Sequence, residues 1–265
     1  MTSTPQISIV MPCYQQVKFL EEAVRSVLDQ EDVDLELLVM DPGSTDGSRE
    51  LLHALRTEYG DSLQLHFAPD DGQADAINRG MDMARGNILG WINSDDRLRP
   101  GSLAQVMPLL DGNDARWLYG RCGIIDERGR KISRYIVWYK NVRGRRFTIH
   151  KLLTEDFIPQ MATFWTRAMW ETAGELDRKR HLAMDYDLFI RFAKIAEPTV
   201  CKQYLADFRV HRHAKSSIRI DEHLEEAFLT ACRHATEYGW RGQSSLLLHR
   251  IYALRTRMIY RLTKP

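Results

Sequence analysis

The segment Ile88-Leu89-Gly90-Trp91-Ile92-Asn93-Ser94-Asp95-Asp96 is a short apolar run that ends in an amide, a hydroxyl and two carboxylates. Such a run is typical of a buried parallel strand, and an open α/β sheet binds its ligands at the carboxyl ends of its strands. Two adjacent carboxylates at that place repel each other unless a cation lies between them. Oxygen ligands suit Mg²⁺ or Mn²⁺, and Mg²⁺ is usually shared with a substrate phosphate, so the segment suggests a metal–diphosphate site. The alternative is that Asp95 and Asp96 cap a helix that begins near Pro100.

The composition is typical of a soluble globular protein. The chain has 265 residues, of which 44% are hydrophobic and 28% are charged, and this length suits one large domain or a domain with an appendage. The formal net charge of +1 creates no field that attracts nucleic acid, so we expect no nucleic-acid partner. The cysteines have neither CxxC nor zinc-site spacing, and the sequence contains no signal peptide and no run of about 18 apolar residues. We therefore expect a cytoplasmic protein.

Strands and helices alternate regularly as far as Ile92. Short apolar runs rich in β-branched residues predict the strands, and apolar residues at helical spacing predict the helices between them. This alternation predicts a doubly wound, mostly parallel sheet with helices on both faces. The connections are almost always right-handed, so the loops that follow the strands gather at one edge. The predicted strands are 7–11, 35–40, 63–67 and 88–92, and the predicted helices are 19–28, 72–85 and one from the turn at 44–48 to about 59.

Four polar clusters would meet at that edge. They are Pro12-Cys13-Tyr14, Asp41-Pro42-Gly43-Ser44, Asp70-Asp71-Gly72-Gln73 and Asn93-Ser94-Asp95-Asp96. Tyr14 can stack on a base, Asp41 can accept hydrogen bonds, and Gly43 lets the backbone approach a ligand closely. Each cluster alone could be a turn, a packed ring or a solvated helix face, but four in succession favour a binding edge. The glycines match neither GxGxxG nor a P-loop, which argues against a dinucleotide cofactor and against ATP-driven phosphoryl transfer.

These clusters resemble the successive signatures of family-2 glycosyltransferases, in segments 7–14, 41–48, 71–80 and 90–96. The resemblance extends over roughly residues 6 to 215. It implies a GT-A fold and the transfer of a sugar from a nucleotide-diphosphate donor, favoured here as a UDP-sugar, with inversion of the anomeric centre. It also implies Mn²⁺ or Mg²⁺ as the cofactor.

The resemblance assigns donor-binding roles residue by residue. It implies that Pro12 and Tyr14 line the base pocket, that Asp41 contacts the base and that Ser44 lies near the base. It also implies that the nucleotide and the donor sugar are bordered by Asp71, Gln73, Asp75 and Asn78.

The resemblance also assigns the metal ligands. Asn93-Ser94-Asp95 takes the place of the family's Asp-x-Asp motif, with an amide where the family often has a carboxylate. Asp95 is therefore the first candidate metal ligand and Asp96 the second. A histidine that approaches the metal or the diphosphate is best matched by His211, supported by Arg212 and His213, although a lone histidine is more often structural.

Inverting transfer requires a general base that takes the proton of the acceptor hydroxyl. In the family this base resembles the second residue of a Glu-Asp pair before a helix, and here the pair is Met184-Asp185. Asp185 is the predicted base, and Asp187 is the alternative. Gln160 and Trp165, with Asp187, are predicted to contact the acceptor. The structural interpretation is that Asp185 only caps its helix.

The segment that follows Asp96 predicts a helix at 102–110, a strand at 117–119 and a hairpin at 124–137. Residues 135–151 mix aromatic with basic side chains. Such mixtures suit anionic or sugar-bearing partners and membrane interfaces, and the alternative is an ordinary mobile surface loop.

From about Asp221 the pattern changes to long helices. Residues 241–265 combine a leucine-rich stripe with basic residues and contain no acid. Such a helix is typical of a membrane-surface element, and the alternative is a helix packed on its own domain or in a dimer. A position on the cytoplasmic face of the inner membrane would suit a polyprenyl-diphosphate-linked acceptor.

We therefore predict a metal-dependent inverting glycosyltransferase that acts on a glycan or lipid-linked sugar in surface polysaccharide assembly (O-antigen, capsule or exopolysaccharide). The predicted organisation is a nucleotide-sugar-binding half (1–110), an acceptor-binding and catalytic half (111–220) and a basic helical extension (221–265). Asn93 and Met184, at positions that are often acidic, keep a non-catalytic nucleotide-sugar-binding protein as an alternative. A nucleotidyltransferase is a further alternative, but the segment after the first strand lacks the Gly-rich basic loop that this class needs.

Overall fold

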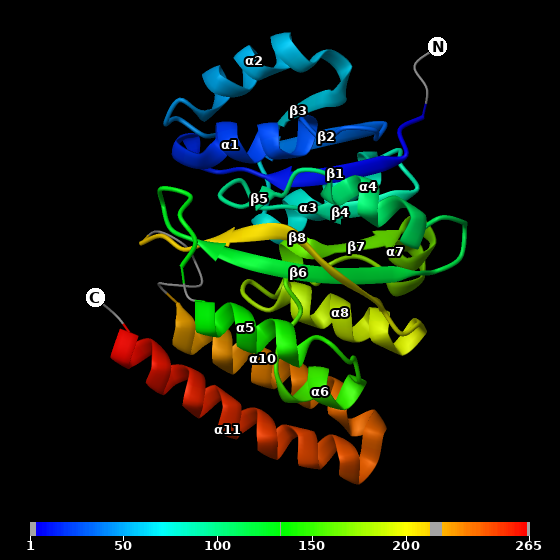
Figure 1. Ribbon diagram of the computed structural model, residues 1–265, viewed down its shortest axis with the longest axis vertical. Coiled ribbons are helices and arrows are strands. Elements are labelled where there is room, and N and C mark those ends of the chain that lie inside the picture. Colours follow the sequence, from blue (N-terminus) through cyan, green and yellow to red (C-terminus); the bar gives the residue numbers. More distant parts are fainter. Residues whose placement is uncertain (1–3, 133, 213–218, 264–265) are drawn as a thin grey trace.

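The computed structural model describes residues 4–132, 134–212 and 219–263, and its centre is one eight-stranded sheet with the order β3-β2-β1-β4-β7-β6-β8-β5 (Figure 1). The first half of the sheet is parallel and consists of β1 (Ile7–Pro12), β2 (Leu35–Asp41), β3 (Leu63–Phe67) and β4 (Ile88–Trp91). The predicted strands and their parallel pairing are thus confirmed.

The remaining strands make the other half of the sheet mixed. They are β5 (Arg97–Leu98), β6 (Trp117–Ile125), β7 (Thr163–Thr166) and β8 (Thr199–Arg209). β7 runs antiparallel to β4 and β6, β8 runs parallel to β6, and β5 runs antiparallel to β8. β7 therefore joins the parallel half to the second half, and it brings the loops after β4 and β8 toward the same edge.

Helices cover both faces of the parallel half, as predicted. α1 (Val17–Leu28) and α2 (Ser48–Tyr59) share a hydrophobic core with Ile9 and Met11, whereas α3 (Gln73–Met83) shares the other core with Val10. Successive side chains of a strand point to opposite faces, so a strand buried on both sides must be apolar throughout. This requirement explains why β1 is mostly apolar, and its one hydroxyl, on the buried Ser8, donates to Glu36.

Close packing fixes the position of α3 on β1. A Cβ atom added at Gly80 of α3 would lie 2.5 Å from Cγ1 of Val10, which is too close for any real contact. The helix can therefore approach the strand only because residue 80 has no side chain. α3 in turn carries Gln73, one of the predicted donor-binding residues, at its first position.

The predicted hairpin at 124–137 is only partly correct. The backbone N–H of Asp126 donates to the carbonyl of Arg130, and that of Ile132 donates to the carbonyl of Ile124, so a tight turn follows β6. The chain then enters α5 (Arg134–Arg143) instead of a second strand. β6 is also longer than the predicted strand 117–119, because β8 pairs with it as far as Ile125.

Residues 135–151 are predominantly helical, so the alternative of an ordinary surface loop is wrong. α5 is followed by α6 (Ile149–Thr154), whose first turn is capped by the Thr148 hydroxyl accepting from the backbone N–H of Lys151. α6 contacts the C-terminal helices and α8. Tertiary packing therefore stabilises helices in a segment whose own sequence has little amphipathic pattern.

The second half adds a layer of helices that lies below the sheet in Figure 1 and consists of α5, α6, α8 (Met184–Ile195), α10 (Ile220–Ala235) and α11 (Gly239–Thr263). The short helices α4 (Ser102–Val106) and α7 (Arg167–Ala173) lie beside the sheet strands instead. Ala227 and Ala231 of α10 belong to the same core as Phe189 of α8, so the predicted helical extension packs on the domain itself. The division at residues 110 and 220 stays a prediction. Among the described residues, we find no helix with the length and hydropathy that crossing a bilayer requires.

Replacing Gly80 by alanine should destabilise the protein. Alanine normally favours a helix over glycine, but the clash with Val10 should outweigh this gain and lower the free energy of unfolding by about 1–3 kcal/mol. Urea denaturation followed by tryptophan fluorescence would measure the change. Asp82→Ala, at an exposed position of the same helix, is the control and should change stability little. Equal stability of Gly80→Ala and wild type would contradict the packing described here.

Candidate functional site

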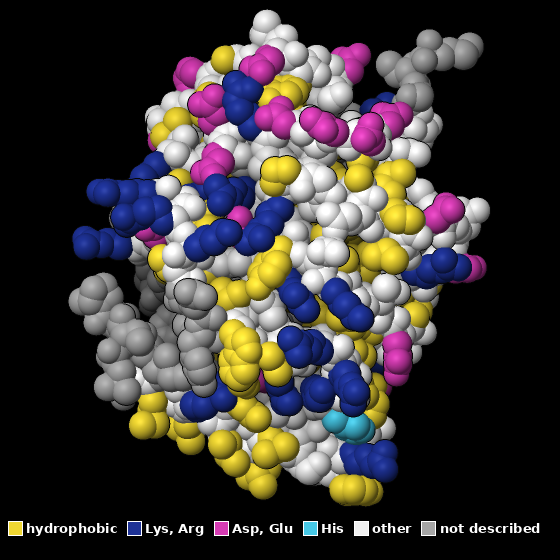
Figure 2. Space-filling view, viewed as in Figure 1, with side chains coloured by type: hydrophobic (Ala, Val, Ile, Leu, Met, Phe, Trp, Pro, Cys, Tyr) yellow, Lys and Arg dark blue, Asp and Glu magenta, His cyan; other side chains and the backbone are white. Residues whose placement is uncertain are grey.

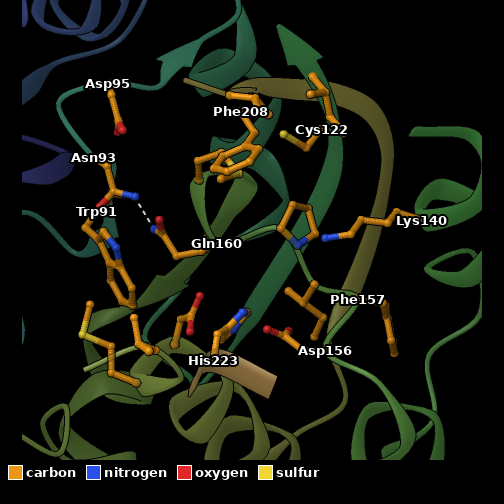
Figure 3. Close-up of a pocket in the computed structure, with 18 of the residues that line it drawn as sticks. Trp91, Asn93, Asp95, Cys122, Lys140, Asp156, Phe157, Gln160, Phe208 and His223 are labelled. Carbon is orange, nitrogen blue, oxygen red and sulfur yellow. Dashed lines mark hydrogen bonds between the residues drawn. The ribbon is translucent and has the colours of Figure 1, made fainter. Parts of the chain in front are cut away.

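A single cavity of about 2830 Å³ runs from the loops after the parallel strands to the helical layer formed by α5, α10 and α11. Figure 3 shows that Asn93 and Asp95 lie at one side of this cavity, whereas Lys140, Asp156 and His223 lie at another. The two groups come from segments far apart in the sequence.

The first end of the cavity is formed by the loops after β1 and β2. Pro12 and Tyr14 line it, and the Tyr14 ring is 61% exposed, so a flat group could stack on it. Gly43 also lines it with a φ of +145°, which a side chain would rarely tolerate. Burial, reinforced by the charge of Asp41, raises the pKa of the lining Cys13 thiol to about 12.

Asp41 is buried and is not itself a lining residue, but it has an unused hydrogen-bond acceptor. Its Oδ1 atom accepts from the backbone N–H groups of Gly43 and Ser44, both at 2.8 Å, and pairs with Arg49 at 3.2 Å. Its Oδ2 atom is buried without a hydrogen-bond partner among the described residues. The hydroxyl of the buried Ser44 accepts a hydrogen bond from the backbone N–H of Gln15, so it joins the loops after β1 and β2. Ser44 itself does not line the cavity.

The third predicted cluster is divided between the cavity and the protein interior. Gln73 lines the cavity, and its side-chain amide donates to Asn93 at 2.8 Å. Asp71 is exposed and does not line the cavity. Asp75 is buried in ion pairs with Arg79 and Arg178.

Asn78 has a role in packing. It is fully buried, and its side chain both donates to and accepts from the backbone of Leu176. The structure therefore does not bring the side chains of Asp71, Asp75 or Asn78 to the lining of the cavity, and their contact with the donor stays a prediction. Two of the three are occupied in holding α3 to the chain around residues 175–178.

The two adjacent carboxylates after β4 have different surroundings. Asp95 lines the cavity, and its Oδ2 atom lies 2.9 Å from Nε2 of His211. Ser94, between Asn93 and Asp95, is buried and also lines the cavity. Asp96 is buried, does not line the cavity and accepts a hydrogen bond from the backbone N–H of Arg209 at 2.8 Å. Asp96 thus holds β8 against this loop, and its alternative role as a metal ligand stays a prediction without support from the cavity lining.

Arg209 strengthens the same connection. Its side chain is almost completely buried, donates to the backbone carbonyls of Asp95 and Asp126 and pairs with Glu22. His211, two residues later, packs its ring on Phe19 at 4.9 Å and faces Asp95. Arg212 also lines the cavity, whereas His213, its predicted support, lies outside the described residues.

Asp95 and His211 are the residues that fit a divalent metal. In the part of the chain that the structure describes, no group of three or more His, Cys, Asp or Glu residues could hold an ion. A carboxylate and an imidazole side by side nevertheless suit Mg²⁺ or Mn²⁺, because these ions usually take few protein ligands and complete their shell with substrate phosphates and water. The pair fits such an ion if a diphosphate supplies further ligands.

The other end of the cavity holds Asp185, at the start of α8. Asp156 follows α6, His223 comes from α10 and Lys140 from α5, and all three line the cavity with Asp185 (Figure 3). The Oδ1 atom of Asp156 is buried and has no hydrogen-bond partner in the described chain. Sequence reasoning missed Asp156, Lys140 and His223. Asp156 could have been suspected because it is an acid directly before the apolar pair Phe157-Ile158. The sequence around His223 contains no feature that indicates a place in the cavity.

Burial and mutual charge set the protonation of these groups. Burial raises the pKa of Asp185, and burial together with the charge of Asp185 raises the pKa of Asp156 to about 8. Burial lowers the pKa of His223, so this imidazole is neutral near pH 7. The charge of Asp185 is one cause of the raised pKa of Asp156, so the two buried carboxyl groups titrate as a pair and Asp156 holds its proton over the pH range below about 8.

The predicted acceptor contacts are only partly brought to the cavity. Gln160 lines it, donates to the backbone carbonyl of Trp91 at 2.7 Å and leaves its own buried Oε1 atom unpartnered among the described residues. Trp165 is fully buried in the core against Trp91 and does not line the cavity. Its acceptor contact stays a prediction, to which the position of the ring in the core gives no support.

Asp187 also does not line the cavity, so its acceptor contact stays a prediction. It is buried outside the cavity, pairs with Arg191 at 2.9 Å and contacts His234 at 3.0 Å and Arg180 at 3.4 Å. His234 and Arg191 lower the pKa of its carboxyl to about 2 despite burial. Asp187 joins α8 to α10 and to the segment before α8, so it is a structural ion-pair residue.

Known proteins resemble this chain over most of its length. The model of glycosyl transferase family 2 matches residues 8–172. An uncharacterised glycosyltransferase of Rickettsia typhi is 23% identical over 233 residues, which is 85% of this chain and 70% of that protein. Chondroitin synthase of Pasteurella multocida is 27% identical over 196 residues, or 73% of this chain but 19% of the much longer synthase.

Solved structures share the fold. The mannosyltransferase PcManGT of Pyrobaculum calidifontis, solved with GDP-Man and Mn²⁺, aligns with a TM-score of 0.71 at 20% identity and covers 98% of this chain and 74% of that one. Residues 1–349 of TarS from S. aureus, solved with UDP-GlcNAc, align with a TM-score of 0.67 at 15% identity and cover 87% of this chain and 66% of that one. The sheet described above is therefore that of GT-A glycosyltransferases.

Replacing Asp156 by asparagine should stabilise the protein near pH 8. Between the ordinary aspartate pKa near 3.9 and about 8, folded Asp156 keeps a proton that the unfolded chain releases, so the stability of the wild type falls as the pH rises through this window. Asparagine removes this dependence. The variant should be more stable at pH 8, by on the order of 1 kcal/mol or more, and the two proteins should converge near pH 4.

Urea denaturation at pH 4 to 8 would test this prediction. Asp61→Asn, which removes an exposed carboxylate paired with Arg56, is the matched charge control and should not change the slope of stability with pH. A constant difference between Asp156→Asn and wild type across the range would show that Asp156 is already ionised in the folded protein.

Proposed function

Because the chain belongs to glycosyl transferase family 2, we propose that it transfers a sugar from a nucleotide-diphosphate donor to an acceptor hydroxyl with inversion of the anomeric centre. One observation supports this reaction above all. The Asp95–His211 pair, suited to a diphosphate with its metal, and Asp185, suited to a general base, line the same cavity.

The loops after β1 and β2 would bind the nucleotide. The exposed Tyr14 ring offers a stacking surface, and the unpartnered Oδ2 atom of Asp41 can accept a hydrogen bond from a base N–H or a ribose hydroxyl. Gln73 and Asn93 would border the diphosphate and the sugar. We favour a UDP-sugar as the donor, as in the TarS complex, and GDP-sugars are the alternative, as in PcManGT.

Asp185 would act as the base. Its ionised carboxylate takes the proton of the acceptor hydroxyl while that oxygen forms the new bond to the anomeric carbon. The bond between the anomeric carbon and the diphosphate oxygen breaks on the opposite side, and its electron pair leaves with the nucleotide diphosphate. Asp156, still protonated near pH 7, can donate a hydrogen bond to the acceptor beside the attacking oxygen.

Asp95 and His211 would hold Mn²⁺ or Mg²⁺. Bound there, the ion would neutralise the charge that develops on the departing diphosphate. His211 and Asp95 are held in place for this purpose by the hydrogen bonds of Arg209 and by the Phe19 ring. Arg212, a lining residue, would add positive charge near the diphosphate.

The proposed acceptor is a glycan or a polyprenyl-diphosphate-linked sugar. Chondroitin synthase among the relatives supports a polysaccharide product, and we propose a role in surface polysaccharide assembly at the cytoplasmic face of a membrane. This chain spans only 19% of that synthase, so the acceptor and the pathway of the two proteins can differ.

A non-catalytic nucleotide-sugar-binding protein is the second candidate. It is favoured by Met184 and Asn93, which stand where the family often has acids. Such a protein would bind a nucleotide diphosphate at the same loops without turnover. The experiments below distinguish the two candidates.

Nucleotide diphosphates should stabilise the protein in a metal-dependent manner. UDP at 100 times its Kd should add about 2.7 kcal/mol to the free energy of unfolding, seen as a higher Tm with Mn²⁺ than with EDTA. Asp95→Asn and His211→Ala should lose the metal-dependent part, whereas Asp61→Asn should keep it. GDP, dTDP and CMP would be tested in the same way. Failure of every diphosphate to stabilise the protein would contradict the proposed donor site.

Replacing Asp185 by asparagine should lower the transfer rate about 10²-fold or more while nucleotide binding is retained, because the base is lost but the donor loops are unchanged. The assay is release of UDP from UDP-GlcNAc with a panel of methyl glycosides as acceptors. Asp187→Asn is the matched control: it should lower stability but keep the rate per folded molecule. Donor binding without turnover in the wild type would favour the non-catalytic candidate.

A further inference from the structure

The outer face of α11 carries a stripe of exposed apolar side chains. Leu247, Ile251, Leu254 and Met258 follow one another at intervals of four, three and four residues and are 64%, 55%, 57% and 64% exposed. This spacing places them on one face of the helix. Trp240, at the start of the same helix, is 76% exposed. So many large apolar side chains on one face of a helix mark an interaction surface.

The opposite face of α11 is firmly packed. Ser245 and His249 are buried, and Nδ1 of His249 lies 3.0 Å from the carbonyl oxygen of Leu153 on α6. Gly242 approaches α10 so closely that a Cβ atom would lie 2.0 Å from the carbonyl oxygen of Ala235. The helix is therefore fixed on the domain by its inner face, and its apolar stripe stays on the outside.

Positive charge accompanies the stripe. The segment 239–263 contains no acidic residue, and Arg241 and Arg250 are exposed on α11. Figure 2 shows hydrophobic side chains along the lower edge of the molecule, over α11, and a band of Lys and Arg directly above them. In the neighbouring α5, Trp138 and Val142 are also exposed. Apolar side chains bordered by cations are the pattern of a helix that lies in the surface of an anionic bilayer.

We propose that the outer face of α11 docks on the surface of an anionic lipid bilayer, with Leu247, Ile251, Leu254 and Met258 among the acyl chains. Trp240 suits the level of the headgroups, where tryptophan is enriched. A second copy of the chain suits the face less well. A two-fold contact joins identical patches, so it would bring the arginines of both copies together with no acid on α11 to pair them.

Docking would also orient the cavity. His249, Tyr252 and Thr256 on the inner side of α11 line it, together with the basic Lys140, Arg145 and Arg146. The acceptor end of the cavity would thus lie close to the lipid surface and offer cations to a phosphate group. This step rests on the proposed function: it makes the acceptor a sugar carried on a membrane lipid through a phosphate or diphosphate.

Vesicle flotation of the full chain tests the docking. The wild type should float with vesicles of phosphatidylcholine and phosphatidylglycerol and much less with phosphatidylcholine alone. Ile251→Glu with Leu254→Glu should weaken binding about tenfold or more, because two inserted side chains become charged. Arg241→Gln and Arg250→Gln should each weaken vesicle binding roughly fivefold, and added salt should also weaken vesicle binding.

The control is Met83→Glu with Leu109→Glu, which makes the same change at two exposed apolar residues outside α11 and should leave flotation unchanged. Circular dichroism and UDP-induced stabilisation verify that each variant is folded. Absence of wild-type flotation at low salt, equal flotation of the α11 variant, or a dimer in sedimentation that the α11 variant abolishes would each overturn the proposal. Flotation needs no transferase activity, so its outcome is independent of the proposed reaction.

Discussion

The arrangement of the site depends on one buried contact, between the end of β8 and the loop after β4. Asp96 accepts the backbone N–H of Arg209, and the buried Arg209 guanidinium donates to the carbonyl of Asp95 and pairs with Glu22. A buried charge that loses its partner is strongly destabilising, so this contact has little freedom to vary. It fixes the backbone on both sides of the Asp95–His211 pair, and the proposed diphosphate site follows from that geometry.

The cavity separates two kinds of charge chemistry. At the strand loops the protein offers a carboxylate and an imidazole that can share a cation, whereas at the helices it buries two carboxyl groups and a neutral imidazole. Keeping the groups apart lets one carboxylate serve as a base while another serves a metal. Since buried electrostatic interactions are stronger than those in water, each end can hold a protonation state that solvent would not allow.

The sequence predicts the parallel half of the sheet well because its signals are local. Apolar runs, turn residues and helical spacing mark β1 to β4 and α1 to α3 without reference to the rest of the chain. The second half depends on contacts between distant segments, so β7, β8 and the helix α5 could not be predicted. The same limit applies to the site: sequence spacing cannot tell which of Asp95 and Asp96, or of Asp185 and Asp187, faces the cavity. Partners more than a hundred residues away decide the first pair, and α10 and the segment before α8 decide the second.

Cys13 stands directly between the two residues predicted to line the base pocket, and its burial has a chemical consequence. The thiolate is the reactive form of cysteine, and a pKa of about 12 leaves almost none of it at physiological pH. The nucleotide edge therefore contains a sulfur atom that resists alkylation, disulfide exchange and oxidation by peroxide. Reagents that attack accessible thiolates should therefore react slowly with Cys13.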